Sequence, residues 1–265
     1  MRIVVPIKQV PETNAVRMDE ATGTMVREGV EAIVNPLDLY AIEAALRLRE
    51  RYGGEVVTVS MGPAKAERAI REALAMGCDS GVLVSDKVFG GSDTWATSYV
   101  LAAAIKKIGR FDLVICGERA TDGDTGQVGP GIAAFLDLPV ASYVGAVERV
   151  EDGVCRVRRL VEEGHEVLDV QLPAVLTVVK EVGEPRLPTL RGKQRAKRAA
   201  VQVWGQGELG VDAAQVGLKG SPTRVVKIFR PKVARECVKH VAGDEAAVEA
   251  AVEKLVEFLG ERDLI

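Results

Sequence analysis

The sequence has little of the material from which self-sufficient catalytic or metal sites are usually made. Only 4% of its residues are aromatic, and its histidines are limited to His165 and His240. The cysteines lie far apart, at Cys78, Cys116, Cys155 and Cys237. Because no pair of them has the spacing of metal ligands, we expect buried, reduced thiols and surface histidines, and no metal centre.

Familiar catalytic and phosphate-binding motifs are missing as well. There is no Gly-x-x-x-x-Gly-Lys-Ser/Thr loop, no Gly-x-Ser-x-Gly elbow and no His-Glu-x-x-His. The first expected strand, Arg2–Lys8, is not followed by Gly-x-Gly-x-x-Gly, which argues against a dinucleotide-binding Rossmann start. If a nucleotide binds this chain, we expect a cofactor to supply the chemistry.

Charge and hydropathy limit the partners and the compartment. A formal net charge of −3 gives no overall attraction to nucleic acid or to an anionic membrane. No apolar run is long enough to span a bilayer, and the N-terminal residues lack a signal-peptide pattern. We therefore expect a soluble, cytoplasmic protein that binds no nucleic acid.

Strands and helices alternate in the first half of the chain. After Arg2–Lys8, buried strands are expected at Val56–Ser60, Gly81–Ser85 and Phe111–Cys116, with helices between them. This order predicts a doubly wound, mostly parallel α/β sheet, in which ligands lie beyond the carboxyl ends of the strands. A polar excursion before the first helix suggests a hairpin around Thr22-Gly23.

The pattern changes in the second half. Alternating segments at 143–150, 155–161 and 166–171 predict an antiparallel extension, and Leu172–Val179 predicts one more buried strand. Two prolines and a basic cluster predict an exposed arm over Lys180–Trp204. A strand at Arg224–Phe229 and a helix at about Asp244–Leu259 would complete the chain. We therefore expect one domain over residues 1–180 and a partner-binding loop and arm over 181–265.

The segment Cys116–Gly131 combines glycines with small polar residues between a buried strand and a helix. Such a loop presents backbone N–H groups at a helix N-terminus, where a phosphate is favoured by both dipole and donors. An ordinary Gly-rich turn, capped by its own Asp and Thr side chains, would have the same composition. The pattern leaves both interpretations open.

Two polar groups near this loop also allow two interpretations. Asp122 and Asp124 could hold a magnesium ion or act in acid–base chemistry, or they could fix the loop by accepting hydrogen bonds. Asn35-Pro36 has the form of a helix N-cap and first turn, with Asp38 at the third position. A helix N-terminus at that place could also face a ligand.

Several motifs, taken in order along the chain, resemble the beta (small) subunit of electron transfer flavoprotein. They are Lys8–Pro11, Asn35–Glu43, Ser60–Pro63, Asp122–Pro130 and Glu184–Leu190. The resemblance covers residues 1 to about 200. It implies an adenine-nucleotide-binding α/β domain that pairs with an FAD-carrying alpha subunit. The complex would pass electrons between a flavin-dependent dehydrogenase, such as an acyl-CoA dehydrogenase, and an acceptor, with any membrane link made through a quinone reductase.

The resemblance also implies which residues bind the nucleotide and which dock a partner. The nucleotide site would comprise Pro6, Asn35, Pro36, Leu37, Asp38, Met61, Ala120, Thr121, Asp122, Gly123, Asp124, Thr125, Gly126, Gln127, Val128, Gly129, Pro130 and Gly131. The docking loop would comprise Glu184, Pro185, Arg186, Leu187 and Leu190, with Leu190 as apolar anchor. Judged from its residues alone, that segment would be interpreted as an exposed linker.

The identity of the nucleotide is the open point. Within the family, plain carriers hold AMP in this subunit, while electron-bifurcating members hold a second FAD and use NADH. The Asp122–Pro130 loop looks like the bifurcating version, since plain carriers tend to have a third acidic residue where Gly123 stands. FAD is therefore expected, with AMP as the alternative. A nucleotide-sensing module remains a rival, and an adenylating enzyme is disfavoured because the first strand lacks a Ser-Gly-Gly-x-Asp-Ser type of loop.

Overall fold

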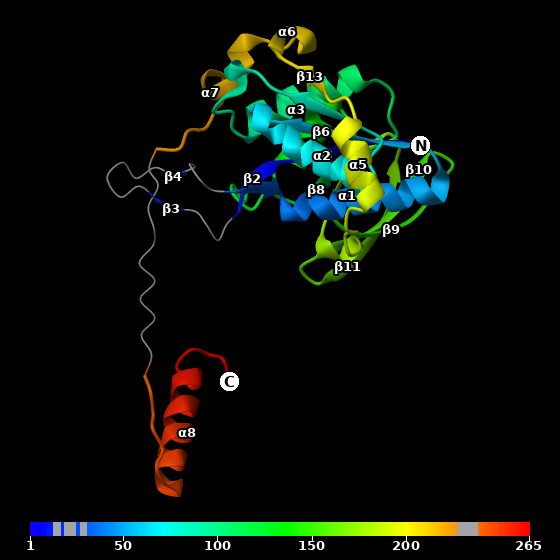
Figure 1. The fold of residues 1–265 in the computed structure, drawn as a ribbon. Helices are drawn as coiled ribbons and strands as arrows, with labels where there is room; N and C mark the ends of the chain where they lie inside the picture. The colour runs from blue at the N-terminus through cyan, green and yellow to red at the C-terminus, as the bar shows by residue number, and fades with distance from the viewer. Residues whose placement is uncertain (13–16, 19–24, 27–30, 227–237) are drawn as a thin grey trace. The chain divides into compact units, whose positions relative to one another are not determined.

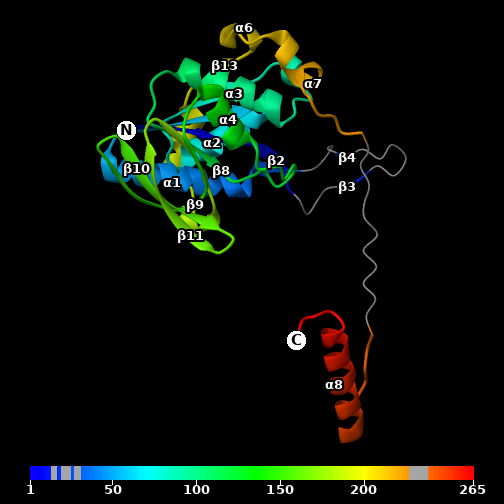
Figure 2. The same cartoon turned by 180° about the vertical axis from the view of Figure 1, so that it is seen from behind.

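The computed structural model describes residues 1–12, 17–18, 25–26, 31–226 and 238–265. It divides into two compact units, residues 1–227 and 228–265. Within the described ranges, none of the helices combines the length and apolarity that a bilayer crossing requires. The first unit contains both candidate sites and is shown from two sides in Figures 1 and 2.

A nine-stranded sheet forms the first unit, in the order β11-β10-β9-β12-β8-β1-β6-β7-β13. Its strands are β1 (Arg2–Pro6), β6 (Glu55–Met61), β7 (Ser80–Val84), β8 (Leu113–Gly117), β9 (Val140–Glu151), β10 (Val154–Val161), β11 (Gly164–Gln171), β12 (Ala174–Val178) and β13 (Gln202–Trp204). In this order, every neighbouring pair of strands from β9 across to β13 is parallel. β10 pairs with β9, and β11 with β10, in antiparallel orientation. The predicted mostly parallel sheet with an antiparallel extension is confirmed.

Helices cover both faces of this sheet. They are α1 (Pro36–Tyr52), α2 (Glu67–Met76), α3 (Thr94–Ile108), α4 (Val128–Leu136), α5 (Leu190–Arg198), α6 (Gln206–Leu209) and α7 (Gly217–Gly220). One core cluster lies under α1, α2 and α5, and a second lies under α3 and α4. Figure 1 shows α2 and α5 side by side, and Figure 2, from behind, shows α3 and α4. The cores are built mainly from Val, Leu, Ile and Ala.

Short elements complete the first unit. β2 (Gln9–Pro11) pairs with β5 (Ala32–Val34), and β3 (Arg17–Met18) pairs with β4 (Met25–Val26), both antiparallel. The second of these pairs flanks the predicted turn, whose residues Thr22 and Gly23 lie outside the described residues. Single 3-10 turns occur at Ala64–Ala66, Lys87–Phe89, Lys180–Val182 and Ala213–Gln215.

The predicted state of the cysteines and histidines agrees with the structure where it is described. Cys78, Cys116 and Cys155 are buried free thiols, and burial raises the pKa of Cys155 to about 11. His165 and His240 are both exposed. Cys237 lies outside the described residues.

The expected exposed arm over Lys180–Trp204 is wrong from residue 190 onward. This part forms α5, which packs on α2, and β13, which extends the sheet beside β7. Gly192 allows the approach, because a Cβ there would lie 2.1 Å from the carbonyl oxygen of Ala75. Arg195 donates to the carbonyl of Leu74 at 2.9 Å, and Arg71 donates to that of Ala196 at 2.6 Å. Each helix therefore supplies an arginine that caps the C-terminal end of the other.

The C-terminal part of the chain agrees with expectation in one element. Its helix is α8 (Glu245–Gly260), whose N-cap Asp244 accepts a hydrogen bond from the N–H of Ala247 at 2.8 Å. Every residue of α8 is at least partly exposed. Of the strand expected at Arg224–Phe229, residues 224–226 have no regular structure, and the remainder lies outside the described residues. The predicted domain boundary near residue 180 stays a prediction.

Candidate functional site

The direction of the chain through the sheet reverses between β1 and β8. From β1 the chain continues outward to β6 and β7, whereas β8 and β12 lie on the other side of β1. Ligands of doubly wound sheets bind at such a switch point, beyond the carboxyl ends of the strands. Here these ends are Pro6 and Gly117, and the Gly-rich loop begins directly after Gly117.

Asn35 joins the start of α1 to the Gly-rich loop. Asn35 is completely buried; its Nδ2 donates to the carbonyl of Arg119 at 2.9 Å, and its Oδ1 accepts from the N–H of Thr121 at 3.2 Å. Among the described residues its side chain makes no cap bond to α1, so the predicted capping role is wrong for the side chain. Pro36 does occupy the first helical turn, as predicted. The amide group of Asn35 instead fixes the path of the loop.

Asp38 lies below the same loop as a buried carboxyl group. It accepts from the N–H of Lys8 at 2.7 Å, and a Cβ at Gly117 would lie only 2.5 Å from its Oδ1. Burial raises the pKa of Asp38 to about 7, against the hydrogen bonds from Lys8 and Asn35, which lower it. Gly117 is thus required for the close contact between the start of α1 and the end of β8.

The two acidic residues of the loop are paired with cations. Asp122 Oδ1 lies 2.6 Å from Nζ of Lys8, and Asp124 Oδ1 lies 3.2 Å from Nε of Arg119. Asp122 and Asp124 were expected to fix the loop by accepting hydrogen bonds from neighbouring N–H groups. In the structure they form ion pairs instead. Among the described residues, no group of three His, Cys, Asp or Glu side chains is arranged to hold a metal ion.

A run of unpaired backbone donors follows these carboxylates. In the described part of the chain, no acceptor forms a hydrogen bond with the N–H groups of residues 125–129. Gly126 has φ = +64°, a conformation that glycine adopts readily, and Val128 begins α4. The donors thus lie at and just before the N-terminus of a nine-residue helix, where the helix dipole also favours an anion.

Close packing holds α4 at this place. A Cβ at Gly129 would lie 2.5 Å from Cγ2 of Thr177 on β12, and a Cβ at Gly131 would lie 2.4 Å from Oγ of Ser98 on α3. These two glycines therefore allow α4 to pack closely against β12 and α3. At Gly123, by contrast, a Cβ would have none of the described atoms within 4 Å. That exposed turn could accept a larger residue without a clash against the described part of this chain.

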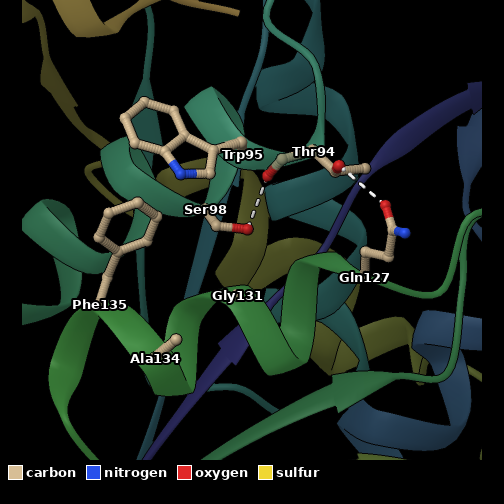
Figure 3. A pocket seen from close by; sticks show the side chains of 7 residues that line it. All are labelled: Thr94, Trp95, Ser98, Gln127, Gly131, Ala134 and Phe135. Atoms are coloured by element: carbon tan, nitrogen blue, oxygen red, sulfur yellow. Dashed lines mark hydrogen bonds between the residues drawn. The ribbon is translucent and has the colours of Figure 1, made fainter. Parts of the chain in front are cut away.

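A pocket of about 470 Å³ opens between α3 and α4, beside the free donors. Figure 3 shows Trp95 and Phe135 at one end, with ring centroids 5.3 Å apart, and Thr94 beside Gln127 at the other. Thr94 Oγ1 lies 3.1 Å from Gln127 Oε1. The residues that line the pocket are Thr94, Trp95, Ser98, Gln127, Gly131, Ala134 and Phe135. Gln127 and Gly131 belong both to this pocket and to the predicted nucleotide loop.

The structure brings most of the predicted nucleotide residues to one edge of the sheet. Pro6 ends β1 and is buried, and Met61 ends the neighbouring strand β6. Asn35 bonds the loop and Asp38 lies against Gly117, as described above. Residues 121–125 are exposed, while Gly129 is buried against β12.

The predicted docking residues lie elsewhere, over the middle of α1. Leu187 and Leu190 are 86% and 82% exposed, whereas Arg186 is bonded to α1 through Glu43 and Glu50. The docking segment therefore does not share a pocket with the nucleotide loop in the described structure.

Sequence reasoning missed three residues of the nucleotide edge. Lys8 contributes both an N–H to Asp38 and an ammonium group to Asp122. Arg119 pairs with Asp124, and Thr177 forms the surface on which Gly129 rests. Two signals could have found Lys8: it stands at the carboxyl end of the expected first strand, and it opens the Lys8–Pro11 motif of the resemblance.

The sequence comparisons agree with this architecture. Residues 22–209 match the family model described as electron transfer flavoprotein domain. The chain is 46% identical to an electron transfer flavoprotein subunit beta of Thermoanaerobacterium thermosaccharolyticum, over 100% of both chains. It is 48% identical to the caffeyl-CoA reductase-Etf complex subunit CarD of Acetobacterium woodii, over 87% of this chain and 88% of that one. Protein FixA of Azotobacter vinelandii is 43% identical, over 96% and 94% of the two chains.

Proposed function

The chain belongs to the electron transfer flavoprotein family, as a beta subunit, and on this premise we propose that it binds FAD at the loop between β8 and α4. The observation that supports this most directly is the run of free N–H groups over residues 125–129, seen among the described residues at the N-terminus of α4. A diphosphate is an anion with several acceptor oxygens, so it suits such a run of donors.

The residues around the loop support a bound nucleotide in different ways. Asn35 holds the backbone of Arg119 and Thr121, so the loop is shaped before a ligand arrives. Lys8 carries a cation, and its pairing with Asp122 keeps it at the same edge. Pro6 and Met61 offer packing contacts at the ends of β1 and β6.

We favour FAD over AMP because of two features. Gly123 leaves the loop free of a third carboxylate near the anion, which would repel a diphosphate. The pocket beside α4 also offers aromatic side chains, Trp95 and Phe135, at the end opposite Gln127, whose N–H is among the donors that would hold the phosphates. AMP, with one phosphate and no second ring system, would leave this pocket empty.

A bound flavin would supply the redox chemistry, accepting and releasing one or two electrons. The chain's own residues bind and orient it, and none of them is assigned a catalytic role. We propose that the complex passes electrons between flavoenzymes, and that it bifurcates electrons from NADH if both subunits carry FAD.

The proposed partners follow from family membership. They are an FAD-carrying alpha subunit and a flavin-dependent dehydrogenase such as an acyl-CoA dehydrogenase. Any contact with a membrane would be indirect, through a quinone reductase. Docking to the dehydrogenase is assigned to Glu184–Leu190, because Leu187 and Leu190 are exposed apolar side chains on an otherwise anchored segment. The expected compartment is the cytoplasm.

The nucleotide content of the heterodimer tests the cofactor. Acid extraction of the co-purified alpha–beta complex should yield two FAD per heterodimer and no AMP. One FAD with one AMP would refute the bifurcating function and leave the electron-carrier function standing.

A substitution at Gly123 tests the location. Gly123→Asp should lower flavin content from two to one per heterodimer, because its carboxylate would lie near the diphosphate. Gly207→Asp is the matched control, since a Cβ at Gly207 on α6 also meets open space within the described residues. Equal flavin content in Gly123→Asp and wild type would contradict the proposed place of the diphosphate.

A further inference from the structure

The segment Glu184–Leu190 combines exposed leucines with a firmly held backbone. Leu187 and Leu190 are 86% and 82% exposed, which makes them the two most exposed leucines among the described residues. Between and around them, the chain is tied to α1 on one side and to α2, through α5, on the other. The segment is therefore held at both ends by the hydrogen bonds described below.

Glu43 is the centre of the first tie. Its side chain is only 4% exposed, on the buried face of α1. Its carboxylate accepts from the N–H of Arg186 at 3.1 Å, from Nε of Arg186 at 2.7 Å and from Nη2 of Arg186 at 3.1 Å. It also accepts from Nε of Arg47 at 2.7 Å. A carboxylate has about four acceptor positions, so these bonds satisfy it fully.

Arg186 is held from a second direction as well. Its guanidinium group contacts Glu50, one of whose oxygens lies 3.1 Å from Nη2. Arg47 adds a bond of 3.3 Å from Nη2 to the carbonyl of Glu184. Burial alone would raise the pKa of Glu43, but the hydrogen bonds from Arg186 and Arg47 outweigh it and hold that pKa below its usual value. The carboxylate is therefore ionised at neutral pH, as a bidentate arginine contact requires.

The second tie lies at the other end of the segment. The hydroxyl of Thr189 accepts from the N–H of Gly192 at 3.0 Å and so caps α5. Gly192 packs against the carbonyl of Ala75, and Arg195 binds the carbonyls at the end of α2. Leu187 and Pro188 thus span a short interval between two anchored points.

We propose that Arg186 and Glu43 are positioning residues for partner docking, which hold Glu184–Leu190 so that Leu187 and Leu190 project into solvent in one arrangement. This inference rests on the proposed docking role of the segment. The two charged residues act through the leucines and need not touch the partner. Ordering the segment in advance removes a cost that binding would otherwise bear.

The size of the effect follows from that cost. Immobilising a flexible side chain or loop residue on binding typically weakens an affinity by a few-fold each. Loosening the interval that carries Leu187 and leads into Leu190 at the start of α5 should therefore raise the KM for the partner by about tenfold. The maximal rate should not change, because the flavins and their surroundings are unaffected.

The test uses Arg186→Lys in the complete alpha–beta complex, with Glu43→Gln as a second variant. Lysine keeps the charge but cannot bond two carboxylates in parallel. Arg156→Lys is the matched control, because Arg156 makes a similar bidentate pair with Asp169 on the β10–β11 hairpin. Hydrogen–deuterium exchange of residues 184–190 and steady-state reduction by an acyl-CoA dehydrogenase that reduces the wild-type complex are then measured.

Arg186→Lys and Glu43→Gln should each speed amide exchange in residues 184–190 and raise the KM for the dehydrogenase about tenfold, with kcat and flavin content unchanged. Arg156→Lys should do neither. The positioning role is tested provided that Leu190→Ala raises the KM. It is then overturned if Arg186→Lys shows the wild-type rate of amide exchange in residues 184–190. It is also overturned if exchange is faster but the KM is unchanged. If Leu190→Ala also leaves the KM unchanged, the docking role itself is wrong and the positioning role is lost with it.

Discussion

Asp38 should lower the free energy of unfolding as the pH rises, whereas most carboxylates raise it. Replacing Asp38 by Asn should remove this effect. Asp38 is 6% exposed, and burial raises its pKa from 3.8 to about 7. Between these two values the folded chain keeps a proton that the unfolded chain has released. The folded state is therefore favoured by this group at low pH, and this contribution is lost as the pH rises through about 7.

The magnitude follows from the two pKa values. Linkage gives a cost of ~2 kcal/mol at about pH 5 and ~4 kcal/mol at about pH 8, relative to a carboxyl that stays protonated. Between these pH values, the free energy of unfolding should thus fall by ~2–3 kcal/mol through Asp38 alone. An asparagine at this position cannot ionise, so the variant should escape this loss while keeping an oxygen that accepts from Lys8.

Urea unfolding of the wild-type and Asp38→Asn complexes at both pH values measures the effect. The two proteins share every other titrating group, so the change in their stability difference with pH isolates Asp38. Asp137→Asn is the matched control, because Asp137 is exposed and its φ of +54° is also tolerated by Asn. If the stability difference between wild type and Asp38→Asn changes by less than ~0.5 kcal/mol, the raised pKa of Asp38 is refuted, and burial does not dominate its ionisation.

Three further substitutions test the loop and the docking segment. Asn35→Ala should cost ~1–3 kcal/mol, as buried partners lose their bonds, and should weaken flavin retention measured by dialysis. Gly129→Ala should lower stability by ~1–3 kcal/mol through overpacking on Thr177, and adding Thr177→Ser should restore much of it in thermal unfolding. Leu190→Ala should weaken dehydrogenase binding by ~2 kcal/mol while the melting temperature stays constant.

Local signals were sufficient to predict most elements of the sheet and its helices. The N-caps Asp93 and Asp244 accept hydrogen bonds from the N–H groups of Ala96 at 3.0 Å and of Ala247 at 2.8 Å, and Asp is a residue type typical of this position. Gly53 ends α1 with φ = +74°, as its position in the sequence indicates. Such signals depend on residues within a few positions of each other, so they can be recognised without the tertiary structure.

Contacts between distant segments explain the failures. The basic segment after residue 190 was expected in solvent because its charge suggested hydration, yet Arg195 and Arg71 bond helix ends more than 120 positions away in sequence. Asn35 was expected to cap α1, yet its amide bonds Arg119, which is 84 positions away. In both cases a polar side chain found a backbone partner that only the folded sheet brings near.

The position of the candidate site was predicted, but not what keeps it in shape. The alternation of strands and helices along the sequence indicated that the loop after Cys116 would lie at a carboxyl edge of the sheet, and it does. The free donors that the described residues show at 125–129 could not be predicted, because a Gly-rich loop can equally satisfy its own N–H groups. In the structure the side chains of Asp122 and Asp124 pair with cations instead, which leaves those donors unoccupied.

The helix α1 connects the two candidate sites at a fixed distance along its axis. Asn35 at its start holds the nucleotide loop, and Glu43, eight positions later, holds the docking segment. At 1.5 Å per residue, these attachments are separated by about 12 Å along the helix axis. A hydrogen-bonded helix changes its length very little, so the two attachments keep a fixed separation. Glu43 and Asn35 variants should therefore impair partner docking and flavin binding separately, whereas a change that displaces α1, such as Gly117→Ala against Asp38, should impair both.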